Sequence, residues 1–202
     1  LGGHVLNADG SVATNYNGIL EAKVFDKRIA RQTLGNDGTQ IGGELGILNF
    51  STLGETIFSG QASVSNGQFE FDFVVPRDVQ IPVGNGKVSF YCKQNGLLRD
   101  NNGFNLDIQV GGLNPNAGTD TTGPVIDLFM NDENFISGGV TNDAPNLIVK
   151  LEDANGINTA SGIGHDLVAI LDGDQANPFK LNDYYQADVD NYTKGTASFK
   201  LR

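Results

Sequence analysis

ETIFSGQASVSNGQFEFDFVV, residues 55–75, carries the clearest structural pattern in the chain. The tetrapeptide Ser65-Asn66-Gly67-Gln68 is typical of a two-residue β-hairpin, because Asn-Gly suits a type I′ turn. After this turn, Phe69, Phe71 and Phe73 alternate with polar residues, so their rings lie on one face of the expected strand. The stretch therefore predicts a hairpin whose aromatic face belongs to a hydrophobic core.

A period close to two recurs along the rest of the chain and indicates further strands. The expected strands cover residues 17–28, 87–92, 104–110, 125–130, 147–151, 167–171 and 196–201. Residues 167–171 also fit a helical face, but their flanking glycines and short apolar run favour a core strand. No helical pattern stands out in residues 1–112. The sequence therefore predicts an all-β protein.

Residues 113–123, LNPNAGTDTTG, have the composition of a linker, since they are rich in Gly, Asn and Thr and poor in apolar side chains. We expect two β-sandwich domains in tandem, at residues 1–112 and 124–202, with the second immunoglobulin-like. An immunoglobulin-like sandwich needs about seven strands, and fewer are recognisable after residue 124. We therefore expect an incomplete second domain with an open sheet edge.

Charge and cysteine content exclude several classes of function. Asp and Glu number 24 against 13 Lys and Arg, a net charge of −11, which disfavours binding to nucleic acid or to anionic lipid. No apolar run approaches the roughly 20 residues that span a bilayer, so membrane insertion is not expected. A single cysteine rules out a disulfide scaffold. The first residues lack an apolar signal segment, and we expect a piece of a longer protein.

Two residues that could carry catalytic chemistry have better structural interpretations. Cys92 is in phase with Val88 and Phe90 on an expected strand, which favours a core position over a nucleophile. His165 stands beside Asp166, but neighbouring residues on a strand point to opposite faces, so they form no ready-made dyad. We expect His165 to bond a loop carbonyl. No catalytic and no cofactor-binding residue is predicted.

Calcium is the one metal that the acidic loops suggest. Asp153 and Asn155 have the spacing that opens an EF-hand loop, but the twelfth position is Gly164 where that loop needs a bidentate Glu. A calcium site built from other loops stays open, with Asp153, Asn155 and Asp166 as candidate ligands. The alternative is a set of solvated surface carboxylates that keep the protein in solution.

Long strings of the sequence, in order along the chain, resemble a known family. They are FDK at 25–27, TLGND at 33–37, FSGQASVSNGQFEFDFVVPRDV at 58–79, GNGKVSFY at 84–91, GPVIDLFMND at 123–132, FISGGVTNDAP at 135–145, GINTASGIGHDLVAILDG at 156–173 and LNDYY at 181–185. Together they resemble the C-terminal, non-catalytic region of gingipain-like cysteine peptidases, in particular the sortase type of the type IX secretion system.

The resemblance implies a function that the residues alone do not. In this family the peptidase domain, with its catalytic His and Cys, lies upstream, and those residues have no matching positions here. The implied function is a β-sandwich region that supports or docks that domain at the cell surface, beside an outer-membrane protein of the secretion system. The alternative is an adhesin-like or carbohydrate-binding module of a secreted surface protein.

Overall fold

The computed structural model describes residues 1–77, 79, 82–160 and 166–201. Within these residues the one helical element is a single 3₁₀ turn, η1 (Asn182–Tyr184), and every other regular element is a β-strand. The predicted all-β class is confirmed. No helix in the described part of the chain is long and apolar enough to cross a membrane.

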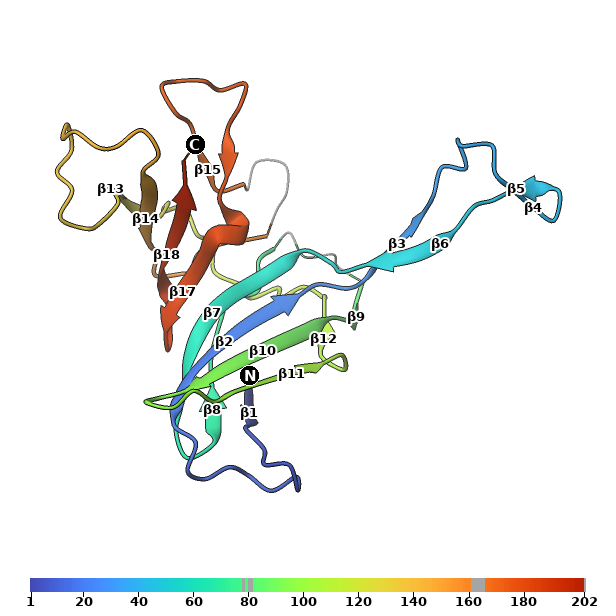
Figure 1. The fold of residues 1–202 in the computed structure, drawn as a ribbon, viewed down its shortest axis with the longest axis horizontal. Helices are drawn as coiled ribbons and strands as arrows, with labels where there is room; N and C mark the ends of the chain where they lie inside the picture. Colours follow the sequence, from blue (N-terminus) through green and yellow to red (C-terminus); the bar gives the residue numbers. More distant parts are fainter. Residues whose placement is uncertain (78, 80–81, 161–165, 202) are drawn as a thin grey trace.

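Eight strands form the main sheet, in the order β11-β10-β2-β7-β17-β18-β14-β13 (Figure 1). Their bounds are β2 (Gly18–Phe25), β7 (Thr56–Val64), β10 (Lys87–Gln94), β11 (Asp100–Asn105), β13 (Val125–Met130), β14 (Asn146–Glu152), β17 (Tyr185–Val189) and β18 (Asn191–Lys200). All neighbours are antiparallel except β7 and β17, which run parallel.

Short strand pairs surround this sheet. They are β1 (Gly2–His4) with β8 (Gln68–Glu70), β9 (Gly84–Asn85) with β12 (Gln109–Val110), β15 (Val168–Ala169) with β16 (Phe179–Lys180), β3 (Ile29–Gln32) with β6 (Asn49–Thr52), and β4 (Gln40–Ile41) with β5 (Glu44–Leu45). The last two pairs form a ribbon that projects away from the main sheet (Figure 1).

The strongest local prediction, the hairpin at residues 65–68, is confirmed. Asn66 and Gly67 both adopt positive φ, at 52° and 73°, as a type I′ turn requires. The backbones of Ser65 and Gln68 exchange both hydrogen bonds at 2.9 Å. A Cβ atom on residue 67 would meet the Ala13 carbonyl, so Gly67 is needed for space as well as for its conformation.

The expected strand after this turn is shorter than predicted. Strand β8 ends at Glu70, and the buried Phe71 adds two backbone hydrogen bonds of 2.8 Å with Leu1, while residues 72–75 form no strand. The rings are held by stacking instead, with the centroid of Phe58 5.6 Å from that of Phe71 and 4.8 Å from that of Phe73. The expected aromatic core is therefore present without the expected strand length.

Two other expected strands are corrected. The strand expected at residues 104–110 instead runs from Asp100 to Asn105 as β11, because these residues pair with β10, which begins at Lys87, and the Tyr91 hydroxyl donates to Asp100 at 2.7 Å. Only Val168 and Ala169 form a strand within residues 167–171, because their partner β16 has two residues. Leu171 is 46% exposed, so this segment is not the expected core strand.

The strands on either side of residues 113–123 share one sheet. Ala187 of β17 lies beside Gly60 of β7 in parallel register. Next to this pair, the Asp190 amide donates to the Gln61 carbonyl at 3.0 Å, and the Asp190 carboxylate accepts the Ser63 amide at 2.8 Å. Residues 111–124 contain no strand and are exposed, as expected of a linker. The division into domains at 1–112 and 124–202 stays a prediction.

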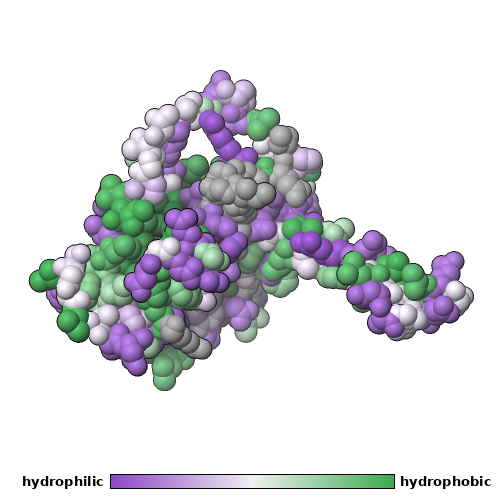
Figure 2. Space-filling model, turned by 90° about the horizontal axis from the view of Figure 1, so that it is seen from above, coloured by the Kyte–Doolittle hydropathy of each residue, from purple (hydrophilic) through white to green (hydrophobic). Residues whose placement is uncertain are grey.

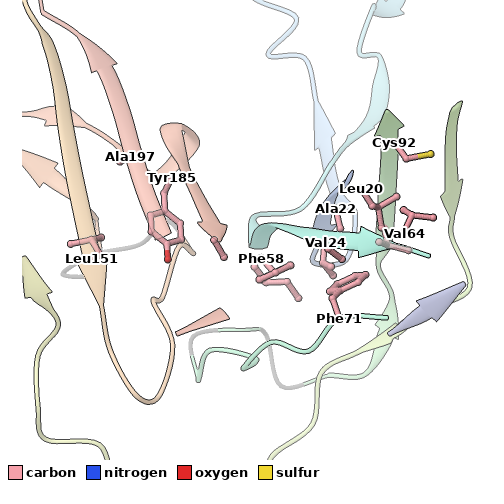
Figure 3. Packing of buried hydrophobic residues seen from close by; sticks show 14 of the residues in the cluster. Leu20, Ala22, Val24, Phe58, Val64, Phe71, Cys92, Leu151, Tyr185 and Ala197 are labelled. Carbon is pink, nitrogen blue, oxygen red and sulfur yellow. The ribbon is translucent and has the colours of Figure 1, made fainter. Parts of the chain in front are cut away.

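Buried side chains from both halves belong to one hydrophobic cluster. Figure 3 labels ten of them: Leu20, Ala22, Val24, Phe58, Val64, Phe71, Cys92, Leu151, Tyr185 and Ala197. The alternation predicted for residues 17–28 is confirmed, since the three members from β2 are each only 1% exposed. The same holds for β14, where Leu147, Val149 and Leu151 are buried.

Candidate functional site

The three candidate calcium ligands lie in loops with contacts of their own. The Asp153 carboxylate accepts the Asn155 amide at 2.8 Å, which closes a turn after β14. The Asp166 carboxylate lies 2.7 Å from the Lys180 ammonium. No three His, Cys, Asp or Glu side chains gather as a metal site within the described residues. His165 lies outside those residues, and the calcium site stays a prediction.

Cys92 occupies the core position that its strand phase predicted. Its side chain is buried in β10, and its Sγ lies 3.5 Å from the Asn101 carbonyl oxygen. The Tyr16 hydroxyl donates to the Cys92 carbonyl at 3.0 Å. The interpretation of Cys92 as a packing residue is confirmed.

An acidic groove of about 700 Å³ lies between the β7–β8 hairpin and the turn that joins β17 to β18. Its lining includes four carboxylates and four aromatic rings: Glu70, Asp72, Asp188 and Asp190 with Phe58, Phe69, Phe71 and Tyr192. The groove exists because the parallel pairing of β7 with β17 brings these two turns together. The sequence predicted the aromatic face with Phe69 and Phe71 but not Tyr192 or the groove, because the two turns are far apart in the chain.

The charge of this groove is largely uncompensated. In the ion pairs between described residues, no Lys or Arg joins Glu70, Asp72 or Asp188. Burial, and to a smaller extent the negative charge of Asp188, raise the pKa of the neighbouring Tyr185. The groove therefore favours cationic or hydrogen-bond-donating ligands over anions.

Residues 28–53 form an arm that stands off the body as a two-stranded ribbon (Figure 1). Arg31 of β3 is opposite Phe50 of β6, so Ile29 and Leu48, each two residues away from one of this pair, share their face. Phe50 is 45% exposed and Leu48 is 65% exposed. That face also holds Arg31, whereas the other face carries small or polar residues such as Ser51, so the large apolar side chains of β3 and β6 lie on one face.

Hydrophobic side chains continue to the tip of the arm, as Figure 2 shows along its length. Leu34 is 82% exposed and Ile41 is 73% exposed. No residue of the arm belongs to the hydrophobic cluster. A lone two-stranded ribbon is only marginally stable in water, and exposed apolar patches commonly mark interaction sites. The arm is thus a candidate docking element.

Comparison with known proteins gives one line of evidence beyond the fold. No protein-family model matches the chain, and no curated protein matches it. Among solved structures, dimeric latent PorU from Porphyromonas gingivalis is similar, with a TM-score of 0.53 and 26% sequence identity. The chain resembles a segment of PorU. The match covers 100% of this chain and 18% of the PorU chain, so this chain spans less than a fifth of PorU.

Likeness to PorU confirms the expected resemblance at a coarse level, that of a PorU-related region. It does not by itself assign a role to the groove or to the arm.

Proposed function

We propose that this chain is the non-catalytic β-structured region of a PorU-like cysteine peptidase and sortase of the type IX secretion system. In this proposal it supports or docks the peptidase domain upstream in the same polypeptide. The observation that supports this proposal most strongly is the structural similarity to PorU, which covers the whole of this chain and 18% of the PorU chain. A match to so small a part of PorU is compatible with an accessory region. The proposal places this region at the outer cell surface, next to an outer-membrane protein of the secretion system.

The arm supports a docking role. Its apolar face, with Leu48 and Phe50, is exposed and lies outside the hydrophobic cluster. Contact with another domain would remove these side chains from water and stabilise the complex, at roughly 25 cal/mol for each Å² of apolar surface buried. The polar face, which includes Ser51, would stay in solvent.

Site-specific photo-cross-linking in the full-length parent protein tests this docking role. A photoreactive amino acid at Phe50 is expected to cross-link to the peptidase domain of the same polypeptide, as identified by mass spectrometry. The matched control is the same amino acid at Ser51, on the opposite face of the same strand. Equal cross-linking yields at both positions, or none at Phe50, would contradict docking through the apolar face.

A carbohydrate-binding module of a secreted surface protein is the second candidate function. The observation that favours it is the acidic groove, where aromatic rings such as Tyr192 lie beside carboxylates and amides that can bond sugar hydroxyls. Titration calorimetry with a panel of oligosaccharides distinguishes the two functions. Binding that Tyr192→Ala abolishes would favour the module.

A further inference from the structure

Six asparagines of this chain are followed directly by glycine, and asparagine is a thermolabile residue that an adjacent glycine makes more reactive. The backbone nitrogen of the glycine attacks the Cγ atom of the asparagine side chain, and the departure of ammonia leaves a five-membered succinimide. Glycine favours this attack because no Cβ atom hinders the approach of its backbone. Each of the six pairs is therefore a candidate site of deamidation, and the pairs begin at Asn17, Asn66, Asn85, Asn95, Asn102 and Asn155.

Hydrogen bonds to the glycine N–H groups decide which of these pairs can react in the folded chain. A nitrogen whose N–H is bonded to a carbonyl must break that bond before it can turn toward the asparagine side chain, and such local opening costs free energy. Three of the six N–H groups donate to carbonyls outside the main sheet: Gly67 to Tyr16 at 2.8 Å, Gly86 to Ile108 at 2.9 Å and Gly156 to Asp153 at 2.9 Å. These three pairs are protected.

Two more of these glycine N–H groups are bonded within the main sheet. The Gln94 amide donates to the Arg99 carbonyl at 2.9 Å, so Gln94 and every second residue before it in β10 bond to β11. By this alternation the Gly103 amide donates to β10. Gly18 lies opposite Gln94 in a pair without hydrogen bonds, and it therefore directs its N–H to β7 on its other side. These two pairs are protected as well.

Gly96 is the exception among the six glycines. It lies in the turn that joins β10 to β11 (Figure 1), and within the described residues its N–H donates to no backbone or side-chain acceptor. The Asn95 side chain also has no hydrogen-bond partner in this part of the chain, whereas the Asn17 side chain accepts the Asn66 amide at 2.9 Å. At Asn95-Gly96 both reacting groups are therefore free of hydrogen bonds.

The turn around Gly96 also has room to change its conformation. Residues 95–99 are exposed, and a Cβ atom on Gly96 would meet no atom within 4 Å. A Cβ atom on Gly67 would instead meet the Ala13 carbonyl, so the other exposed Asn-Gly turn is confined against the first loop. The tip of the β10–β11 turn can therefore rotate into the geometry of attack while the sheet stays folded.

We propose that Asn95 deamidates spontaneously in the folded chain, through a succinimide with the Gly96 nitrogen, while the other five Asn-Gly pairs stay intact. Hydroxide takes the proton of the Gly96 N–H, and the nitrogen forms a bond to Cγ of Asn95. The side-chain nitrogen takes a proton from water and leaves as ammonia, which regenerates the hydroxide. One water then opens the ring. Cleavage of the new bond at Cγ gives aspartate, and cleavage at the main-chain carbonyl gives isoaspartate.

The product changes the turn in two ways. Either form replaces a neutral amide by a carboxylate and adds one negative charge to the net charge of −11. Isoaspartate also routes the main chain through Cγ, which adds one carbon to the backbone between β10 and β11. The bond from the Gln94 amide to the Arg99 carbonyl closes this loop, so the loop end of the hairpin loosens. The reaction is intramolecular, needs only water, and does not depend on the peptidase proposal.

Peptide mass spectrometry of the native chain, incubated at mildly alkaline pH and digested at acid pH, tests the proposal. We expect deamidation at Asn95 to be about tenfold faster than at Asn66 or more, because the hydrogen bond of Gly67 must first open. In urea, where no pair is protected, the rates should converge. Equal native rates at the two sites, no reaction at Asn95, or a difference that persists unchanged in urea would overturn the proposal.

Two substitutions at exposed positions assign the site by native isoelectric focusing, which separates the more acidic product from the starting protein. Asn95→Gln is expected to abolish the main acidic species, because ring closure is much slower for the longer side chain. Asn155→Gln, at a pair whose Gly156 amide is bonded, is the matched control and is expected to leave that species unchanged. A main acidic species that persists in Asn95→Gln would overturn the proposal.

The products at residue 95 test the route itself. Both aspartate and isoaspartate are expected there, because a succinimide opens at either carbonyl, and electron-based fragmentation of the peptide distinguishes them. Aspartate alone would overturn the succinimide route.

Discussion

At the scale of single residues, two buried tyrosines have opposite roles. The Tyr16 hydroxyl donates to the Cys92 carbonyl at 3.0 Å and so ties the first loop to β10. The Tyr185 hydroxyl is buried and has no hydrogen-bond partner in the described part of the chain. A satisfied buried hydroxyl stabilises a fold modestly, whereas an unsatisfied one carries its desolvation cost.

Removing each hydroxyl should therefore shift stability in different directions. We expect Tyr16→Phe to lower the free energy of unfolding by about 1 kcal/mol, because the Cys92 carbonyl loses a donor. We expect Tyr185→Phe to leave it unchanged or to raise it, because no bond is lost. Urea denaturation of both variants measures the difference, and a larger loss in Tyr185→Phe would contradict this account.

The raised pKa of Tyr185 adds a pH dependence to the same pair. Burial, then the charge of Asp188, favour its neutral form in the folded state. The unfolded chain releases this proton near pH 10, so stability is complete below that pH and falls as pH rises above about 10. The unmodified protein should lose more stability there than Tyr185→Phe does.

At the scale of elements, the arm forms without packing into the hydrophobic cluster. Its strands β3 and β6 bond to each other, and none of its residues lies in the hydrophobic cluster. Under the docking proposal, contact with another domain would cover its apolar face and stabilise it. The body should fold without it.

Deleting residues 30–51 tests this independence. The Thr33 amide donates to the Leu48 carbonyl, and by the alternation of the ladder Ile29 and Thr52 are a hydrogen-bonded cross-strand pair, so a two-residue Asn-Gly turn can join them. We expect a melting temperature close to that of the full chain. For comparison, Phe58→Ala in the stacked aromatic group should cost about 3–5 kcal/mol. A large loss of stability after the deletion would show that the arm supports the body.

At the scale of the whole molecule, the junction between the two halves rests on one parallel strand pair and the contacts beside it. Ala187 lies beside Gly60, and Asp190 holds the backbone of β7 through Ser63 and Gln61. The exposed residues 111–124 add the covalent connection.

Cleavage of that connection is expected to leave the halves together. With a protease site inserted into residues 113–123, the two fragments should co-elute in gel filtration, because the β7–β17 pairing and the shared cluster persist. Asp190→Gly keeps the turn conformation, φ 56°, but removes the side-chain bond to Ser63, and should promote separation. Complete separation of the unsubstituted fragments would show that the junction is weak.

The sequence by itself determined the local features of this protein. Alternation identified β2 and β14 with their buried faces, and Asn66-Gly67 identified a type I′ turn, because pleat period and turn conformation depend on nearby residues. It also placed Cys92 in the core. The strand bounds predicted from the sequence were less accurate at 71–75, 104–110 and 167–171, where the length and position of the partner strand decide how far a ladder extends.

Only the tertiary structure decided which distant segments meet. The β7–β17 pairing, the acidic groove and the exposure of the arm depend on contacts between residues far apart in the chain, or on their absence. Backbone hydrogen bonds are the same for every residue type except proline, so a local pattern shows that a segment is a strand but not which strand lies beside it. The apolar residues of the arm have the alternation of core residues in the sequence, and only the structure shows that they are exposed.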